Sequence, residues 1–432
     1  MSPAPPWPTD VTDPVAVRRD LHAHPEVGFT EVRTAARVLD ALERLGVPVR
    51  TGAAVADVAG LAGLPPAAEL TAAADRAVAQ GVPAELVARF AGGATALVAT
   101  LAGDRPGPAV GLRVDMDALP VAETDASDHP PRSGGYASRT AGVMHACGHD
   151  GHVAIGLALA ARLADRDFPG TVRLLFQPAE EGVRGAAPMV AAGGVEGLDA
   201  LLAVHLGFGL DTGALALRTT DMVSTTKRRV TFTGAAAHAA HAPERGRHAL
   251  LAAAATALAL HTLPAAQPAG TRVNVGRLCG GTATNVVPAT AELAYETRAA
   301  DPAAQTELDR RADEVVAGSA VAYGVDTATA VTGRAVSADT DDRVAEAVGG
   351  AAAGLPAFTD VRARASLRAS DDASLMMQAV QAAGGVAGYL LVGSTGRGAH
   401  HAPDFDLDEA ALSPAVDLLE AVLRAGRLDA AR

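Results

Sequence analysis

The chain has 432 residues, enough for two domains, and 49% of them are hydrophobic. Its net charge of −13 argues against a nucleic-acid partner, because phosphate binding needs a basic surface. Two cysteines, Cys147 and Cys279, indicate no disulfide framework. The first residues lack the pattern of a signal peptide, and the apolar stretch 249–260 is too short to cross a bilayer. We therefore expect a cytoplasmic protein without a membrane or nucleic-acid partner.

The first hundred residues predict mainly helices. Segment 13–45 has an amphipathic helical pattern interrupted near Pro25. We interpret its histidines, His22 and His24, as a polar helix end rather than as metal ligands, with a place in a pocket wall as the alternative. Segment 53–93 is rich in alanine and predicts a helical insertion before a strand at 96–101. Nothing in this insertion indicates a catalytic role, and structural packing and the shaping of a substrate cleft are the two alternatives.

Three short apolar runs then end in chemically useful side chains. The runs cover 110–114, 172–176 and 198–204, and they are followed by Asp115 and Asp117, by Glu180 and Glu181, and by His205. Continuous apolar runs separated by helical stretches predict a mostly parallel sheet with helices on both faces. Because such sheets place their sites at the carboxyl ends of the strands, these side chains are expected to converge.

The segment GVMHACGHDGH, residues 142–152, carries the densest set of possible metal ligands. Cys147 and His149 lie two residues apart in a glycine-spaced segment where a thiolate and an imidazole can meet at one point. This pair suits zinc or, less typically, manganese. A buried helix is predicted at 153–163, with Asp150 as a candidate N-cap. A chance histidine-rich loop over a core is the alternative, and the three strand ends argue against it.

Glu180 and Glu181 have the arrangement that metal-assisted hydrolysis needs. Adjacent carboxylates after a strand usually diverge, so one can bind a metal while the other takes a proton from water. A solvated acidic turn is the ordinary alternative, and the buried strand before the pair disfavours it. Asp115 and Asp117 are expected to orient the ligands from behind.

The pattern changes from residue 226 onward. The predicted order of elements becomes βαββαβ, which is typical of a ferredoxin-like domain. After residue 337 the alternation of strands and helices returns. We therefore predict a catalytic domain formed by 1–224 and 338–432, with a second domain, 225–337, inserted in it.

Several motifs resemble the metallopeptidase family M20 in its amidohydrolase branch. They are RVDMDALP (Arg113–Pro120), MHACGHDGH (Met144–His152), FQPAEEG (Phe176–Gly182) and AVHLG (Ala203–Gly207). The insertion before Gly93 and the segments 280–289, 295–299, 370–381 and 398–409 resemble, more narrowly, the A subunits of p-aminobenzoyl-glutamate hydrolases. The resemblance runs over nearly the whole chain. It implies a zinc-peptidase-like α/β catalytic domain and an inserted α+β lid and dimerisation domain.

The resemblance also implies roles for individual residues. It places two divalent metal ions, Mn²⁺ or Zn²⁺, in each subunit. The matching metal ligands are Cys147, His149, Glu181, His205 and His401. Glu180 matches the general acid/base, and His238 matches a lid histidine that reaches the active site of a partner subunit. Asn285 and Arg298 match positions associated with the carboxylate of the substrate.

The expected function is metal-dependent hydrolysis of an N-acyl or N-aroyl amino acid, with p-aminobenzoyl-glutamate as the leading substrate. Basic residues expected near the cleft or lid suit an acidic leaving group; they are Lys227, Arg228, Arg229, Arg298 and Arg397. N-acetyl amino acids and aryl-acetyl aspartates are alternative substrates. A non-catalytic partner subunit is disfavoured by the intact ligand set and Glu180, and a dipeptide aminopeptidase would need an acidic amine-binding group that the sequence does not identify. The active assembly is expected to be a homodimer or a heterodimer with a related subunit.

Overall fold

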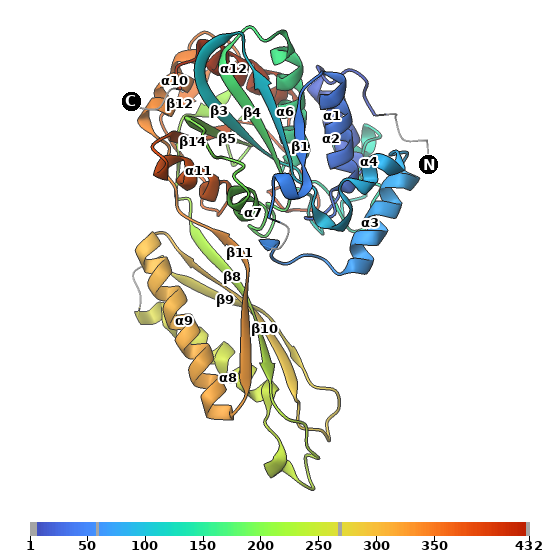
Figure 1. Ribbon diagram of the computed structural model, residues 1–432, viewed down its shortest axis with the longest axis vertical. Helices are drawn as coiled ribbons and strands as arrows, with labels where there is room; N and C mark the ends of the chain where they lie inside the picture. The colour runs from blue at the N-terminus through green and yellow to red at the C-terminus, as the bar shows by residue number, and fades with distance from the viewer. Residues whose placement is uncertain (1–6, 58–59, 267–269, 429–432) are drawn as a thin grey trace. The chain divides into compact units, whose positions relative to one another are not determined.

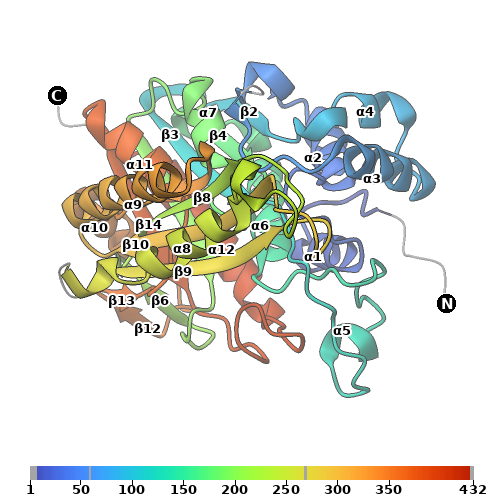
Figure 2. The same cartoon turned by 90° about the horizontal axis from the view of Figure 1, so that it is seen from below.

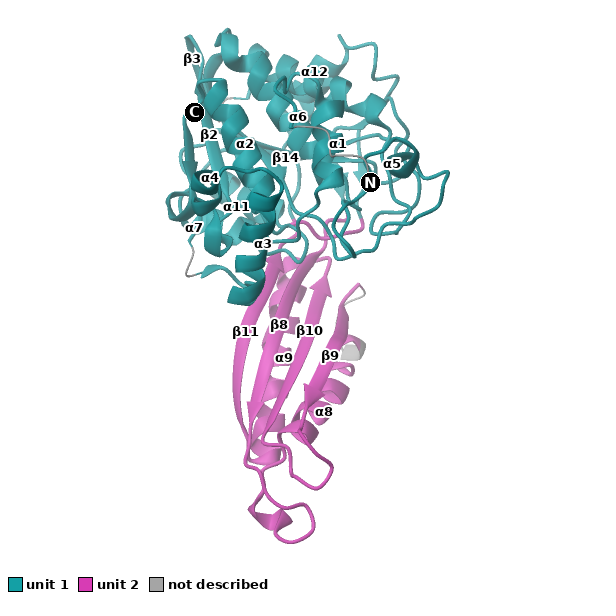
Figure 3. Cartoon of the chain, turned by 90° about the vertical axis from the view of Figure 1, so that its right-hand side faces the viewer, with its two compact units in different colours: residues 1–220, 338–367, 372–432 teal, residues 221–337, 368–371 magenta. Residues whose placement is uncertain are grey.

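The computed structural model describes residues 7–57, 60–266 and 270–428 (Figure 1). The chain divides into two compact units, coloured separately in Figure 3. The larger unit comprises Met1–Thr220, Ala338–Leu367 and Asp372–Arg432, and the smaller unit comprises Asp221–Ser337 and Arg368–Asp371. The sequence analysis placed the corresponding boundaries at 224/225 and 337/338.

The larger unit contains an eight-stranded mixed sheet with the order β1-β2-β4-β3-β5-β14-β6-β12. Its strands are β1 (Val49–Thr51), β2 (Leu97–Ala102), β3 (Arg105–Asp115), β4 (Pro169–Gln177), β5 (Ala200–Leu206), β6 (Ala214–Ala216), β12 (Asp360–Arg362) and β14 (Val386–Val392). The neighbouring strands β4, β3, β5 and β14 are parallel, so their carboxyl ends share one edge. The short strands β7 (Thr219–Thr220) and β13 (Ala365–Ser366) pair separately. The predicted mostly parallel α/β sheet is thereby confirmed.

Helices cover both faces of this sheet because its central strands are apolar on both sides. Alternate residues of β5 and β14 join one core cluster with α1, α2, α6, α10 and α12, while α11 packs on the other face and contacts α7. The bounds are α1 (Pro14–Ala23), α2 (Val32–Arg44), α6 (His149–Arg162), α7 (Ala186–Ala191), α10 (Asp342–Ala352), α11 (Ala373–Ala382) and α12 (Leu412–Ala425). No described helix is long and apolar enough to cross a membrane.

The region 53–93 is largely helical where it is described. Helices α3 (Ala67–Ala79) and α4 (Ala84–Ala88) pack against α2, as Figure 2 shows. A further short helix, α5 (Pro130–Ser133), belongs to the long segment between β3 and α6. That segment brings the cysteine- and histidine-rich motif back to the carboxyl edge of the sheet.

Helix α6 begins differently from the prediction. Its N-cap is Gly148 in a left-handed conformation, with φ of 91°, and His149 is the first helical residue. Asp150 is therefore not the N-cap, so that prediction was wrong. The glycine allows the chain to turn sharply between Cys147 and His149, which brings both side chains to the same place.

The smaller unit has the predicted βαββαβ order. Its antiparallel sheet has the strand order β11-β8-β10-β9, and helices α8 and α9 cover one face. The elements are β8 (Ser224–Thr233), α8 (Ala249–Leu260), β9 (Arg272–Gly280), β10 (Thr290–Ala299), α9 (Pro302–Tyr323) and β11 (Asp326–Ala335). Asp301 caps α9 by accepting from Ala304 N at 2.7 Å. Apolar side chains of the sheet and both helices form a separate core.

Candidate metal centre

The predicted ligands of the larger unit form two groups that share one sulfur atom. Donor atoms of Cys147, His149 and His205 lie within 4.8 Å of one another, and so do those of Cys147, Glu181 and His401. The Cys147 Sγ atom is 3.6 Å from His205 Nε2, and His401 Nε2 is 3.3 Å from Glu181 Oε1. These residues would hold two divalent cations, one in each donor group, with Cys147 a member of both groups.

Backbone hydrogen bonds leave the correct imidazole nitrogens free for metal. His149 Nδ1 donates to the Asp117 carbonyl at 2.8 Å, and His205 Nδ1 donates to the Leu206 carbonyl at 2.9 Å. The remaining His149 Nε2 is buried without a hydrogen-bond partner, and Glu181 Oε1 is likewise buried without a hydrogen bond. Buried polar atoms normally have partners, so these two atoms fit metal ligation.

Two other histidines near the site have different partners. His152 Nδ1 donates to Asp115 at 2.6 Å, and its Nε2 accepts from Leu206 N at 3.1 Å. His400 Nε2 lies 3.3 Å from the Leu206 carbonyl. Both nitrogens of His152 are therefore occupied, and His401, rather than His400, belongs to a donor group.

Asp117 holds the turn that carries the two glutamates. Its Oδ1 accepts from Glu180 N at 2.9 Å and its Oδ2 accepts from Glu181 N at 3.0 Å. Glu31, which sequence reasoning did not single out, accepts from the preceding amide of Ala179 at 2.8 Å. Ala179 has a φ of 50°, a conformation that non-glycine residues rarely adopt. Two buried carboxylates thus fix three successive amides of a strained turn.

The two glutamates diverge from this turn. Glu181 groups with Cys147 and His401, while the Glu180 carboxylate lies 3.9 Å from His149 Nε2 and is almost buried. Glu180 belongs to neither donor group that contains Cys147, although its carboxylate, His149 and Glu181 form a further possible group. This is the place required for a base that acts on a metal-activated water.

The surrounding groups favour the ionised form of the Asp115 carboxyl but the neutral form of the Cys147 thiol. Burial opposes the ionisation of Asp115, but Arg113 and His149 outweigh it and hold the pKa of that carboxyl well below its usual range. Burial raises the pKa of the Cys147 thiol well above its usual value, and the nearby Glu181 charge adds to this effect. A cation at the sulfur would oppose both causes and favour the thiolate.

A network of buried charges behind the metal loop was missed by the sequence analysis. His22 lies in the last turn of α1 and His24 is its C-cap, as the helix-end interpretation expects, but both side chains are buried. His22 Nδ1 lies 2.8 Å from Asp150, and its Nε2 lies 3.0 Å from Glu123. The spacing of these residues along the chain gives no local signal, because the pairs are more than 100 positions apart.

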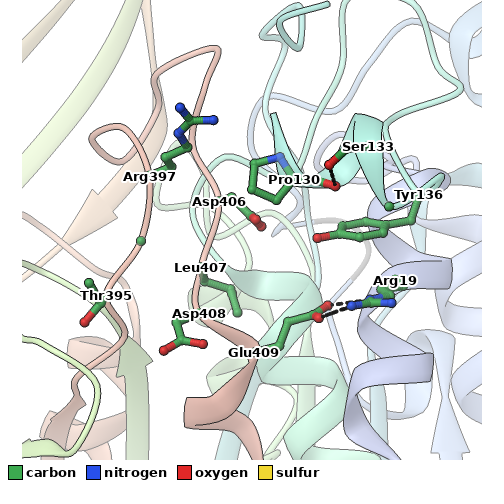
Figure 4. Close-up of a pocket in the computed structure, with 12 residues that line it drawn as sticks. Arg19, Pro130, Ser133, Tyr136, Thr395, Arg397, Asp406, Leu407, Asp408 and Glu409 are labelled. Atoms are coloured by element: carbon green, nitrogen blue, oxygen red, sulfur yellow. Dashed lines mark hydrogen bonds and ion pairs between the residues drawn. The ribbon is translucent and has the colours of Figure 1, made fainter. Parts of the chain in front are cut away.

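A cavity of about 530 Å³ lies on the larger unit, lined by α5 and by residues 395–397 and 406–409 among others. Figure 4 shows its charged lining, in which Arg19 and Glu409 form an ion pair and Arg397 lies apart from them. Arg397 pairs with Asp128 outside the metal groups. None of the predicted metal ligands lines this cavity.

The remaining predicted site residues belong to the smaller unit. His238 and Asn285 are exposed and close together, since Ala239 N donates to the Asn285 carbonyl at 3.0 Å. His238 Nδ1 accepts from two backbone amides, at 3.1 and 3.2 Å, which leaves Nε2 as the outward donor. Arg298 makes a two-point ion pair with Glu296, at 2.9 and 3.1 Å.

The other basic side chains suggested for the substrate are also paired. Arg228 pairs with Asp309 at 2.7 Å, and Arg229 lies 3.6 Å from Glu292. An arginine that already holds a carboxylate must exchange it before it binds a substrate carboxylate. The number of basic residues in the sequence therefore overstated how many arginine side chains are available to bind a substrate carboxylate.

Comparisons with known proteins agree with this geometry. Residues 111–425 match the model of "Peptidase family M20/M25/M40". The chain is 42% identical to the indole-3-acetyl-aspartic acid hydrolase of Enterobacter agglomerans over 406 residues, which is 93% of each chain. It is also 42% identical over 405 residues, 93% of each chain, to the A subunit of the p-aminobenzoyl-glutamate hydrolase of Escherichia coli (strain K12).

Solved structures give the same result. The aminobenzoyl-glutamate utilization protein from Klebsiella pneumoniae matches with a TM-score of 0.82 and 37% identity over 95% of each chain. A dinuclear metal binding peptidase from Bacillus subtilis matches with a TM-score of 0.65 and 25% identity, covering 96% of this chain and 98% of the other. The likeness to a dinuclear protein is consistent with the two donor groups around Cys147.

Proposed function

Because the chain belongs to the peptidase family M20/M25/M40, we propose that it is a metal-dependent amidohydrolase that cleaves N-aroyl amino acids, with p-aminobenzoyl-glutamate as the leading substrate. The observation that carries this proposal is the pair of donor groups sharing Cys147, with Glu180 beside them. A non-catalytic subunit would need no such base next to a complete ligand set.

Each residue of the larger unit has a defined task in this proposal. Cys147, His149, Glu181, His205 and His401 hold two divalent cations. Bound cations of the Mn²⁺ or Zn²⁺ type supply Lewis-acid activation of water and of the amide carbonyl. Glu180 removes the proton of the attacking water and passes it to the leaving amine. Asp117 keeps Glu180 and Glu181 in place through their backbone amides.

The smaller unit supports an active site shared between two chains. Asn285 and His238 lie at the Thr290 end of β10, whereas Arg298 lies near its other end. Eight residues of an extended strand separate Thr290 from Arg298, which corresponds to about 27 Å. His238 and Arg298 of one chain are thus too far apart to serve one substrate. We assign His238 and Asn285 to the site of a neighbouring subunit, in a homodimer or with a related chain.

A second substrate class is favoured by one specific observation. The indole-3-acetyl-aspartic acid hydrolase of Enterobacter agglomerans is as similar to this chain as the p-aminobenzoyl-glutamate hydrolase subunit is. Aryl-acetyl aspartates are therefore the alternative substrates. Both classes combine an aromatic acyl group with an acidic amino acid.

The test is an amine-release assay with purified protein. Substrates are p-aminobenzoyl-glutamate, indole-3-acetyl-aspartate, N-acetyl-glutamate and a dipeptide, each with added Mn²⁺ or Zn²⁺. The proposal predicts hydrolysis of an aroyl or aryl-acetyl amino acid that is lost in Glu180→Gln. Absence of amide hydrolysis with either metal, in protein shown to contain two cations, would overturn it.

A further inference from the structure

A cavity of about 550 Å³ in the larger unit is lined by residues adjacent in the chain to two candidate metal ligands, Leu206 beside His205 and His400 beside His401. It lies between segment 206–211, which follows His205, and segment 394–407, which contains His401. Small-molecule sites commonly enclose about 300–1,000 Å³. Each of the two segments that line the cavity therefore contains or directly follows a candidate metal ligand in the chain. The volume of the cavity suits a small organic group.

Aromatic side chains of the cavity lining contact His205. The Phe208 ring meets the His205 ring edge-on, with centroids 4.6 Å apart, and stacks on His400 at 4.4 Å and 20°. Phe405 completes the wall, 5.0 Å from His400. The chain has only eight phenylalanines, so this concentration of rings beside the metal donors is unusual for its composition.

The backbone at Phe208 is in a conformation that bulky residues rarely adopt. Its φ is 49°, in the left-handed region, and glycines with positive φ flank it at 207 and 209. A strained phenylalanine is a reason to look for a role in binding, because such strain persists where the surrounding structure enforces it. The Phe208 side chain is only partly buried, so part of its surface stays available to a ligand.

We propose that this cavity receives the aromatic acyl group of the substrate, with Phe208 and His400 as the residues that select a planar ring. The inference rests on the proposed amidohydrolase function and specifies which side of the scissile amide faces this wall. Offset or edge-to-face contacts with Phe208 would stabilise an aryl group and not an acetyl group. The cavity in Figure 4 shares Asp406 and Leu407 with this one, but Phe208, His400 and Phe405 do not line it.

The far part of the cavity offers a partner for a polar ring substituent. The carboxylate of Asp211 and the hydroxyl of Thr395, 3.4 Å apart, both belong to its lining. Both side chains are exposed and can accept a hydrogen bond from an aromatic amine. The cavity thus combines a flat apolar wall near the metals with acceptors at its mouth.

The experiment compares Phe208→Leu with the wild type on benzoyl-glutamate and N-acetyl-glutamate. Loss of the aromatic contact should lower kcat/KM for benzoyl-glutamate about tenfold and leave kcat/KM for N-acetyl-glutamate nearly unchanged. Phe208→Tyr, which keeps the ring, should restore the preference. The matched control is Phe358→Leu, since Phe358 lines a different cavity of about 250 Å³. An equal fall for both substrates, or no change for either, would overturn the inference.

A binding measurement separates this inference from the proposed function. Benzoate is titrated calorimetrically into metal-loaded wild type, Phe208→Leu and Phe358→Leu, with acetate as the control ligand. The inference predicts that Phe208→Leu alone weakens benzoate binding about tenfold. This result stands even if no amide is hydrolysed, which would refute the proposed function instead. Equal benzoate affinity in the three proteins, or no benzoate binding by the wild type, would overturn the inference.

Discussion

Arg18 and Asp150 form a fully buried ion pair, with Arg18 Nε 3.0 Å from Asp150 Oδ2. The same guanidinium donates from Nη2 to Asp406 at 2.5 Å. Asp150 follows the metal-binding residue proposed at 149, and Asp406 lies five residues after His401. One cation in α1 therefore ties together the two segments that carry candidate ligands from the middle and the end of the chain.

Replacing Arg18 with methionine should destabilise the protein by about 3–5 kcal/mol, because it leaves the buried Asp150 and Asp406 carboxylates without their cation. Arg19→Met is the matched control. Arg19 is on the same helix, but its side chain is 45% exposed and pairs with Glu409 at the surface, so its loss should cost below about 1 kcal/mol. Urea unfolding of both variants measures the difference. Equal free energies of unfolding for the two variants would contradict the role of Arg18.

Cys147 belongs to both donor groups, whereas His401 belongs to only one. Substitutions of these two residues should therefore differ in how many metal ions the protein loses. Cys147→Ala removes a donor from both groups, so we expect the loss of both cations. His401→Ala affects only the group with Glu181 and should leave one cation with Cys147, His149 and His205. Elemental analysis of dialysed protein gives the metal content per chain.

Cys279→Ala provides the control for the loss of a thiol, since Cys279 belongs to the smaller unit and to no described donor group. It should retain both cations. A Cys147→Ala protein that still holds two equivalents of metal after dialysis would contradict the assignment of Cys147 to both donor groups.

Glu31 should make the stability of the metal-free protein fall as the pH rises. Burial, with a further contribution from the Asp117 charge, raises the pKa of Glu31 to about 8 in the folded state. Between its unfolded value near 4.5 and this folded value, the folded chain binds the extra proton, so unfolding becomes easier with increasing pH. The slope contributed by one such proton is at most about 1.4 kcal/mol per pH unit.

Glu31→Gln should reduce this slope, because the amide cannot ionise. Urea unfolding in the presence of a chelator, at several pH values from 5 to 9, tests it. Glu43→Gln is the control, since Glu43 is an exposed partner of Arg89. If Glu31→Gln and the wild type lose stability in parallel, Glu31 is already ionised in the folded protein.

The sequence was informative where the signal is local. Apolar runs predicted β3, β4 and β5, and the order of elements predicted the ferredoxin-like topology of the smaller unit. The carboxyl-edge rule predicted that residues following different strands would meet, and Cys147, Glu181, His205 and His401 do enter common donor groups.

The missed features depend on contacts between distant segments. Glu31 reaches Ala179 across 148 positions, and Arg18 reaches Asp406 across 388. The hydrophobic periodicity of the sequence carries no information about such distant pairs. A charged residue on an amphipathic helix is ordinarily exposed to solvent. The strained φ of Ala179 has no local signature either, because alanine seldom adopts it and two buried carboxylates impose it here.

The assignment of His238 to a neighbouring active site predicts complementation between two inactive variants. Glu180→Gln should lower turnover about 100- to 10,000-fold by removing the base, and His238→Ala about 100- to 1,000-fold by removing an oxyanion donor. When the two proteins exchange subunits, each mixed dimer gains one site with both residues intact. Equal mixing at random should then restore about one quarter of the wild-type activity, because half of the dimers are mixed.

Three controls make this result decisive. Each variant incubated alone should stay inactive, and native mass spectrometry of isotopically labelled chains shows whether subunits have exchanged. His241→Ala alone should remain active, since His241 lies on the same exposed loop as His238 but is assigned no role. Proven exchange without recovery of activity would mean that His238 serves the site of its own chain or none, and the shared active site would have to be abandoned.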